Sequence, residues 1–364
     1  MLRIIFLVIM TVHGLIHLLG FVQAFRLAEM REVSMQVSKP AGVVWLSATL
    51  LFGAAVVLFL LKNGAWWPVA AVAVVISQTL ILMYWKDAKF GTIANLIVLL
   101  IVVVGYARWN FHQTYQQDVR HNLARTLTLP RGILTEDDLA PLPAPVQKYL
   151  RYCGGLGREK VVNFKAVFSG EIRSKDGPWM PFSSEQYNFI DVPTRLFFIQ
   201  AVMKGVPADG YHAFKDGRAA MRIKVLSLLP MIDAKGDEMN IAETVTLFND
   251  LCVMAPPALI DPRIRWEAVD DLTAKGYFSH NGITVSAVLL FGEDGRLVNF
   301  ISDDRYALEG TSFRKLRWST PISEYINLGD YILPAKADLI YDYPEGPFCY
   351  GRFALQNLRY NVAE

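Results

Sequence analysis

The sequence is poor in the residues that usually hold metals. Its 364 residues include three cysteines and six histidines, and no two cysteines form a CxxC pair. Structural zinc requires Cys and His ligands at short, clustered spacings, so no metal site is expected. A disulfide between Cys252 and Cys349 is compatible with an oxidising compartment. Buried free thiols at these positions and at Cys153 are the alternative.

Several motifs of common enzymes and nucleic-acid-binding proteins are also missing. No serine lies in a G-x-S-x-G elbow. The glycine-rich run 154–157 (GGLG) precedes an expected strand, which is the wrong order for a phosphate-binding loop. The net charge of +2 does not indicate the strongly basic surface that is typical of nucleic-acid-binding proteins. The sequence therefore predicts no catalytic residue, no cofactor and no nucleic-acid partner, and an enzymatic role is not favoured.

Long apolar runs are confined to the first 110 residues, at about 2–25, 42–61, 66–85 and 91–109. A hydrocarbon core of ~30 Å requires about 20 helical residues, and a helix satisfies its own backbone in lipid. Tryptophans lie near the run ends, where interfacial rings are common. No small-x-small cleavage site precedes Arg26, so the first run is expected to remain as a helix. Residues 1–110 are thus predicted to form an α-helical four-span membrane bundle in the lipid bilayer.

The distribution of positive charge indicates an orientation for this bundle. Five cations lie in the loops after the first and third runs, and three lie on the opposite side: Arg26, Arg31, Lys39, Lys86 and Lys89 against Arg3, Lys62 and Arg108. Because cytoplasmic loops are enriched in Lys and Arg, the two loops are placed in the cytoplasm. Both termini and the remaining chain are then expected outside the cytoplasm, at the inner (cytoplasmic) membrane of a bacterium.

Four polar side chains inside these runs are candidate functional residues: His13, His17, Gln78 and Asn95. His13 and His17 share one helical face. One interpretation is a haem or metal ligand, or a proton relay. Two histidines one turn apart cannot occupy the two opposite axial positions of one haem. The other interpretation is hydrogen bonding between helices, with Gly14 and Gly20 allowing close approach.

Residues 111–143 are predicted to form a polar linker, and residues 144–364 a water-soluble domain. A short amphipathic helix over 146–153 is expected to pack on that domain or to lie near the lipid surface. After residue 157 the apolar period changes from 3.6 to 2, and turn sequences recur at 215–217, 280–282 and 293–295. Strands are expected near 162–172, 187–190, 195–202, 221–225, 277–278, 284–291, 297–302, 313–318, 335–341 and 350–360.

One segment of this region has a helical pattern, over 237–254, and ends before Pro256. A single helix with a broad apolar arc among strands has to bury that arc, and the concave face of a curved sheet is available. The predicted fold is an α+β domain, a curved antiparallel half-barrel of about ten strands with this helix packed on its concave face.

Two groups of polar residues are candidates for a binding site. Glu243, Asn249 and Asp250 lie on the predicted helix, and Asp303, Asp304 and Arg305 follow a predicted strand. Three interpretations are open: a carboxylate base with Arg305 as anion anchor, an anchor for a ligand head group, or a solvated helix face with an Asp–Arg pair at a strand end. Apolar residues expected to line a cavity are Phe168, Val245, Phe248 and Leu251.

The C-terminal stretch YINLGDYILP (325–334), followed by residues 335–340, resembles the closing strands of the lipoprotein-carrier (LolA/LolB-like) half-barrel. The whole chain also resembles a family of uncharacterised bacterial membrane proteins. The matching segments are HGLIHLLGF (13–21), WKDAKFGTIAN (85–95), QKYLRYCG (147–154) and SDDRY (302–306). The second resemblance implies the architecture and brings no activity with it.

Together these patterns predict a membrane-anchored protein of the cell envelope. Its soluble domain is expected to bind a lipid, an acyl chain or a lipoprotein in an apolar cavity. One alternative is a sensor or assembly protein that binds another polypeptide. Another is a membrane oxidoreductase or haem protein that uses His13 and His17. The identity of the ligand, the oligomeric state and the redox state of the cysteines do not follow from the sequence.

Overall fold

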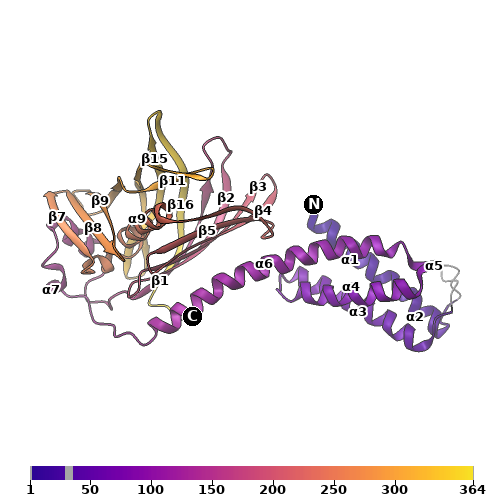
Figure 1. Cartoon of the computed structure of the whole chain (residues 1–364). Coiled ribbons are helices and arrows are strands. Elements are labelled where there is room, and N and C mark those ends of the chain that lie inside the picture. Colours follow the sequence, from indigo (N-terminus) through magenta and orange to yellow (C-terminus); the bar gives the residue numbers. More distant parts are fainter. Residues whose placement is uncertain (1, 29–35, 364) are drawn as a thin grey trace. The chain divides into compact units, whose positions relative to one another are not determined.

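The computed structural model describes residues 2–28 and 36–363. The chain divides into two compact units, Met1–His112 and Gln113–Glu364 (Figure 1). Arg31, which contributed to the charge comparison, lies outside the described residues. The first unit is helical, and the second consists mainly of strands.

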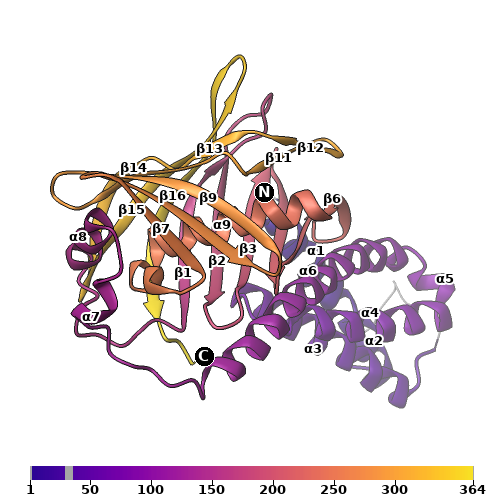
Figure 2. The same cartoon turned by 60° about the vertical axis from the view of Figure 1, so that its left-hand side comes forward.

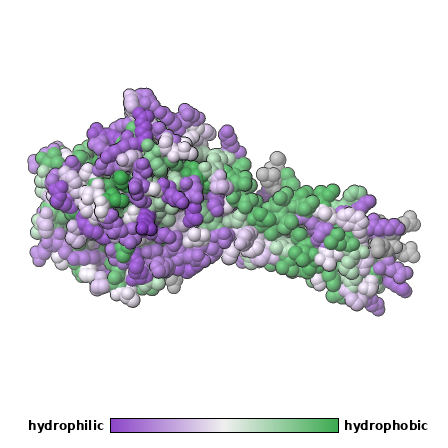
Figure 3. All heavy atoms as spheres, in the orientation of Figure 1, coloured by the Kyte–Doolittle hydropathy of each residue, from purple (hydrophilic) through white to green (hydrophobic). Residues whose placement is uncertain are grey.

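The helical unit has six helices among its described residues, the last of which continues into the second unit: α1 Leu2–Ile16, α2 Leu18–Phe25, α3 Lys39–Leu60, α4 Trp66–Met83, α5 Trp85–Ala88 and α6 Gly91–Thr126. Four stretches are long and apolar enough to cross a membrane: Arg3–Phe25, Lys39–Leu60, Trp66–Met83 and Gly91–Thr126. Their outward surface is mostly hydrophobic (Figure 3). The membrane-compatible helices predicted from the sequence are therefore present.

Small residues and one histidine shape the first of these stretches. A Cβ at Gly14 would lie 2.7 Å from Phe52, and one at Gly20 would lie 2.3 Å from the Trp45 ring. Both glycines therefore permit the close approach to α3 that the sequence predicted. The helix is interrupted at His17, whose Nδ1 lies 2.8 Å from the carbonyl oxygen of His13. A side chain that contacts the i−4 carbonyl in this way explains the break between α1 and α2.

The start of the predicted linker differs in the structure. Instead of becoming irregular at residue 111, α6 continues to Thr126. Tyr115 in this extension packs on the rings of Phe198 and Tyr211, with centroids 5.3 and 5.5 Å apart, and its hydroxyl donates to Glu185 at 3.0 Å. Polar residues on the other sides gave this stretch the appearance of a linker. The packing of Tyr115 on strands and the burial of Val119 and Leu123 explain why it stays helical.

The second unit is built on one 14-stranded antiparallel sheet with the order β6-β5-β4-β3-β2-β1-β16-β15-β13-β10-β9-β8-β7, and β14 also pairs with β15 (Figures 1 and 2). β6 and β7 form its two edges. Its strands are β1 Asn163–Ile172, β2 Met180–Phe189, β3 Thr194–Met203, β4 Val206–Lys215, β5 Arg218–Val225, β6 Leu229–Lys235, β7 Ile264–Asp270, β8 Thr273–His280, β9 Ile283–Phe291, β10 Leu297–Ser302, β13 Arg317–Ser319, β14 Ile322–Leu328, β15 Tyr331–Tyr343 and β16 Gly346–Tyr360. A separate hairpin pairs β11 Tyr306–Glu309 with β12 Ser312–Lys315.

The half-barrel is confirmed, but the estimate of about ten strands is too low. The missed strands include β4, β6 and β7. Pro207 and Gly210 weaken the strand pattern of β4, and Pro230 weakens that of β6. Most of β7 is exposed, so it lacks a buried apolar face. These strands are specified by pairing with neighbours, which a local pattern does not reveal.

The sheet curls far enough for distant turns to meet. The β4–β5 turn has positive φ at Asp216 and Gly217, and the β8–β9 turn has positive φ at Asn281 and Gly282, as expected for tight two-residue hairpins. Asn281 Nδ2 donates to the carbonyl oxygen of Asp216 at 2.7 Å. β5 and β8 lie near opposite edges of the sheet order, so this contact shows how strongly the sheet is curved.

Helices cover both faces of the curved sheet. α9 (Asp237–Met254), which matches the predicted helix, lies inside the curve and contacts β4, β5, β6, β9, β10 and β15 (Figure 2). The 3-10 helix η1 (Pro256–Ile260) follows it. Residues 113–126 of α6 pack on the opposite face through Tyr115. α7 (Glu136–Leu139) and α8 (Ala144–Tyr152) precede β1, and Tyr149 of α8 donates a hydrogen bond to the Cys252 carbonyl at 2.8 Å.

Candidate functional site

A cavity of about 720 Å³ lies between α9 and the concave face of the sheet. Its outer rim includes exposed residues of the β1–β2 loop and of the β11–β12 hairpin, among them Lys175, Asp176 and Arg314. Protein interiors normally contain few voids larger than a water molecule. A space of this volume inside the curve of a sheet has the size of a small-molecule site, ~300–1,000 Å³.

Large apolar side chains form most of the cavity wall. Alternation along β3 and β5 directs one face of each strand into the space. The apolar lining includes Phe168, Ile172, Phe197, Ile199, Met221, Ile223, Met239, Val253, Leu339 and Phe353. These residues provide a surface suited to a hydrocarbon chain.

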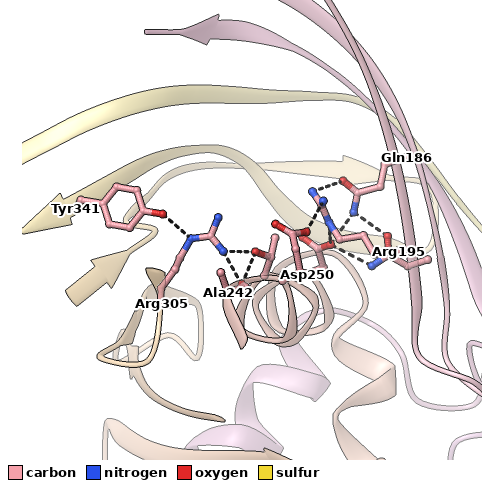
Figure 4. Close-up of polar contacts among 9 residues, drawn as sticks. Gln186, Arg195, Ala242, Asp250, Arg305 and Tyr341 are labelled. Carbon is pink, nitrogen blue, oxygen red and sulfur yellow. Dashed lines mark hydrogen bonds and ion pairs between the residues drawn. The ribbon is translucent and has the colours of Figure 1, made fainter. Parts of the chain in front are cut away.

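A charged cluster lies in the polar part of the wall. Arg195 of β3 contacts two carboxylates of α9: its Nε is 2.8 Å from Asp250 Oδ2, and its Nη1 is 3.2 Å from Glu243 Oε2 (Figure 4). Its Nη2 donates to Gln186 Oε1 at 3.2 Å. Gln186 and Asn188 of β2 donate to Asp250 Oδ2 at 2.7 and 3.0 Å. All five side chains are buried, and each of the three guanidinium nitrogens of Arg195 donates to a protein partner.

A second guanidinium, that of Arg305, lies on the other side of α9 in the same cavity (Figure 4). Its Nε donates to the Tyr341 hydroxyl at 3.1 Å, and its Nη1 donates to the Ala242 carbonyl at 2.7 Å and to Thr246 Oγ1. The guanidinium lies 4.5 Å from the centre of the Trp318 ring, a cation–π distance. Its protein partners are all neutral, in contrast to those of Arg195.

Burial changes the ionisation of several groups here. It opposes the charged form of Glu243, but Arg195 and Arg305 together bring the pKa of Glu243 below its ordinary value. For Asp250, burial outweighs Arg195 and raises the pKa. Burial also lowers the pKa of His212, which lines the cavity, to about 4. His212 is therefore neutral near pH 7, and the charges of the cavity floor reside on the arginines and carboxylates.

The structure brings together five of the predicted ligand-binding residues and separates the others from them. Phe168, Glu243, Asn249, Asp250 and Arg305 line the cavity. The helix face carrying Glu243 and Asp250 is buried, so the idea of a solvated face is wrong. Asn249 Nδ2 donates to Thr320 Oγ1 at 2.7 Å.

The remaining predicted residues lie away from the cavity. Val245, Phe248 and Leu251 belong to the filled core, where Phe248 packs on Phe278 and Phe300 with centroids 5.9 and 5.5 Å apart. Asp303 is exposed and pairs with Arg317 at 2.7 Å rather than with Arg305. The apolar face of α9 packs against the sheet in the filled core. The cavity lies along the more polar face of the helix.

Sequence reasoning missed Arg195, which organises the charged cluster. Arg195, Phe197 and Ile199 occupy alternate positions of β3 and therefore share one face. An arginine on an inward face next to phenylalanine needs buried hydrogen-bond acceptors, and an anionic partner compensates its charge. That alternation was a usable signal, although it does not identify Asp250 and Glu243 as the partners.

The predicted intramembrane polar residues form one network between α1, α4 and α6. His13 Nε2 lies 2.8 Å from Asn95 Oδ1, and His17 Nε2 lies 2.8 Å from Ser77 Oγ. Asn95 Nδ2 donates to Gln78 Oε1 at 3.0 Å. These contacts match hydrogen bonding between helices.

Nothing in the described residues forms a group of three or more His, Cys, Asp or Glu side chains able to hold a metal ion. Cys153, Cys252 and Cys349 are all free thiols, and the first two are buried. The conceivable disulfide between Cys252 and Cys349 is therefore not formed.

Solved structures similar to the chain include the following three. A putative outer membrane lipoprotein-sorting protein domain from Vibrio parahaemolyticus has 10% identity and a TM-score of 0.31, and the match covers 54% of this chain and 85% of that domain. A LolA superfamily protein from Nitrosomonas europaea has 9% identity and a TM-score of 0.31, and the match covers 63% of this chain and 94% of that protein. A DUF1329 family protein from Desulfovibrio piger has 11% identity and a TM-score of 0.34, and the match covers 61% of this chain and 94% of that protein.

No curated protein matches the sequence. Residues 132–353 match the model of a family of unknown function, DUF6544, which agrees with the resemblance to an uncharacterised family. Because this match covers more than half of the sequence, the chain belongs to the DUF6544 family.

Proposed function

We propose that this protein is a membrane-anchored component of the cell envelope that binds a lipid, an acyl chain or the acyl part of a lipoprotein. The helical unit is the anchor, and the cavity between α9 and the sheet is the binding site. The four apolar helical stretches support the first part. The second part depends on the cavity, about 720 Å³ in volume with phenylalanine, isoleucine and methionine walls.

The unfilled apolar wall is the single observation that carries this proposal. Moving hydrocarbon out of water contributes ~25 cal/mol for each Å² of apolar surface that is removed from water. An acyl chain in the cavity would cover its own surface and that of residues such as Phe197, Ile199 and Phe353. A tightly filled half-barrel would have no such capacity.

The charge distribution of the helical unit supports a proposed location. With the loops carrying Arg26, Lys39, Lys86 and Lys89 in the cytoplasm of a bacterium, the C-terminal unit lies on the outer side of the inner membrane. A hydrophobic cavity tethered to a bilayer can exchange a lipid with it over a short path through water. The histidines of the helical unit are assigned no part in binding.

Native mass spectrometry of the full-length protein released from detergent tests this proposal. We expect one lipid-sized adduct per chain that survives delipidating washes, because a ligand within the curved sheet exchanges slowly. Ile223→Trp places a larger ring in the cavity from β5 and should abolish the adduct.

The matched control is Arg222→Trp, one residue earlier on the opposite face of the same strand, and it should keep the adduct. The proposal would be contradicted if repeated preparations of the wild-type protein carried no lipid adduct. An adduct that Ile223→Trp leaves unchanged would also contradict it, because such a lipid would be bound elsewhere.

A further inference from the structure

Arg305 has hydrogen-bonding capacity that its protein partners do not use. Its Nε and both protons of Nη1 are directed to Tyr341, Ala242 and Thr246. Among residues 2–28 and 36–363, none accepts from Nη2, and no carboxylate lies within 4.0 Å of the guanidinium. Figure 4 shows this second terminal nitrogen without a dashed line.

The site holds the guanidinium in place without neutralising it. Trp318 and Tyr341 flank it at 4.5 and 6.0 Å from their ring centres, and Tyr341 is fixed by donating to the Tyr306 carbonyl at 3.2 Å. Neutral acceptors orient a cation while leaving its charge available. Arg195 shows the opposite arrangement, since Asp250 and Glu243 both contact it.

A second polar group is available beside Arg305. Tyr350 stacks on Tyr341 with ring centroids 5.1 Å apart, and its hydroxyl accepts from Trp318 Nε1 at 3.2 Å. Arg305 and Tyr350 both line the cavity, together with apolar residues such as Phe353 and Leu339. An oxyanion there could accept from the guanidinium and from the phenol, with a hydrocarbon chain along the apolar wall.

We propose that Arg305 binds the oxyanion head group of an acidic amphiphile, a carboxylate or a phosphate ester attached to an acyl chain. This assignment rests on the proposed function, because it requires the chain to occupy the apolar part of the cavity. Glu243 of α9 is a counter-charge that acts on Arg305, and it is hydrogen-bonded to Arg195. It reduces the positive potential at Arg305 without occupying Nη2.

Binding of a fluorescent fatty acid and of its methyl ester to the full-length protein tests the head-group assignment. The two probes share a chain and differ in charge. A charge-assisted hydrogen bond contributes ~1.5–3 kcal/mol, so the acid should bind about 10- to 100-fold more tightly than the ester. Arg305→Gln should remove this difference, because it lowers the affinity for the fatty acid and leaves the affinity for the ester unchanged.

The matched control is Arg317→Gln, which removes an exposed guanidinium paired with Asp303 outside the cavity lining and should preserve the preference for the acid. Competition then tests whether the oxyanion must be attached to a hydrocarbon chain. A monoacyl glycerol phosphate or an unlabelled fatty acid should displace the probe, whereas acetate or inorganic phosphate at the same concentration should not.

The outcomes distinguish the two proposals. Equal binding of acid and ester by the wild-type protein would overturn the role of Arg305 and leave the apolar cavity intact. Displacement by acetate or phosphate alone would also overturn it, because no chain would be required. Failure of both probes to bind would contradict the proposed function itself. The wild-type comparison needs no variant and therefore stands even if Arg305→Gln does not fold.

Discussion

The protein contains two buried polar networks, one in each unit, and they are built differently. In the helical unit, His13, Ser77 and Asn95 belong to a network of hydrogen bonds with no acid or arginine in it. In the C-terminal unit, Arg195 and Asp250 belong to a network that carries full charges. The absence of charge from the first network suits the proposed membrane anchor, because a membrane interior penalises charge strongly, whereas paired charge can be buried in a protein core.

The difference also separates structural from binding roles within the cavity. Each guanidinium nitrogen of Arg195 donates to a protein partner, two of them carboxylates of α9, so this side chain ties α9 to β2 and β3. Arg305 is oriented by neutral groups, and its second terminal nitrogen has no partner among the described residues, which is the basis of the proposed head-group role. Two arginines in the same cavity should therefore respond in opposite ways to mutation.

The largest expected effect is on stability at Arg195. Arg195→Leu leaves Glu243 and Asp250 buried without the cation that contacts them, and breaking a buried ion pair in this way costs ~3–5 kcal/mol. The free energy of unfolding of the full-length protein, followed by tryptophan fluorescence in denaturant, measures it. Adding Glu243→Gln and Asp250→Asn should restore part of the loss. A change below ~0.5 kcal/mol would place Arg195 among ordinary surface residues and remove the contrast with Arg305.

A smaller effect is expected from His212 as the pH falls. The pKa of this histidine is lowered by burial to about 4, from an unfolded value of 6.5. Between these values the unfolded chain binds a proton that the folded chain does not, so stability decreases from pH 6.5 towards pH 4. His212→Asn should flatten this part of the stability profile. An unchanged profile would show that other groups control it.

The smallest effect is expected in the helical unit. Ser77→Ala removes the hydroxyl that contacts His17 at 2.8 Å and His13 at 3.2 Å. Hydrogen bonds between membrane helices average ~0.6 kcal/mol, so a modest decrease in the thermal stability of the purified protein is expected. Ser47→Ala in α3, whose hydroxyl donates to the Val43 carbonyl of the same helix, is the control. A complete loss of folding would mean that the neutral network is far more important than this comparison assumes.

Local patterns predicted much of the architecture. The apolar runs, the helix over 237–254 and the turns at 215–217 and 280–282 depend on residues close in sequence, and the structure contains each of them. β4 and β6 escaped prediction because pairing with neighbouring strands, rather than alternation, specifies them. The same reasoning explains why residues 111–126 appeared to be a linker.

The site was predicted less completely, because its partners are distant in sequence. Arg195 and Asp250 are 55 residues apart, and nothing local to Asp250 indicates a cation. Phe248 was expected at the cavity on the basis of its apolar character, yet the same character places it in the filled core. Arg305 was recognised as a possible anion anchor, and its neutral partners Ala242, Thr246 and Tyr341 became visible only in the fold.

Photo-crosslinking with a diazirine-bearing fatty acid tests the central claim most directly, because it reports where the chain lies. After irradiation of the full-length protein and digestion, we expect labelled peptides from β5 and α9, with labelling prevented by excess unlabelled fatty acid. Labels confined to the helices of the first unit, with none in β5 or α9, would show that the hollow of the half-barrel does not receive the ligand.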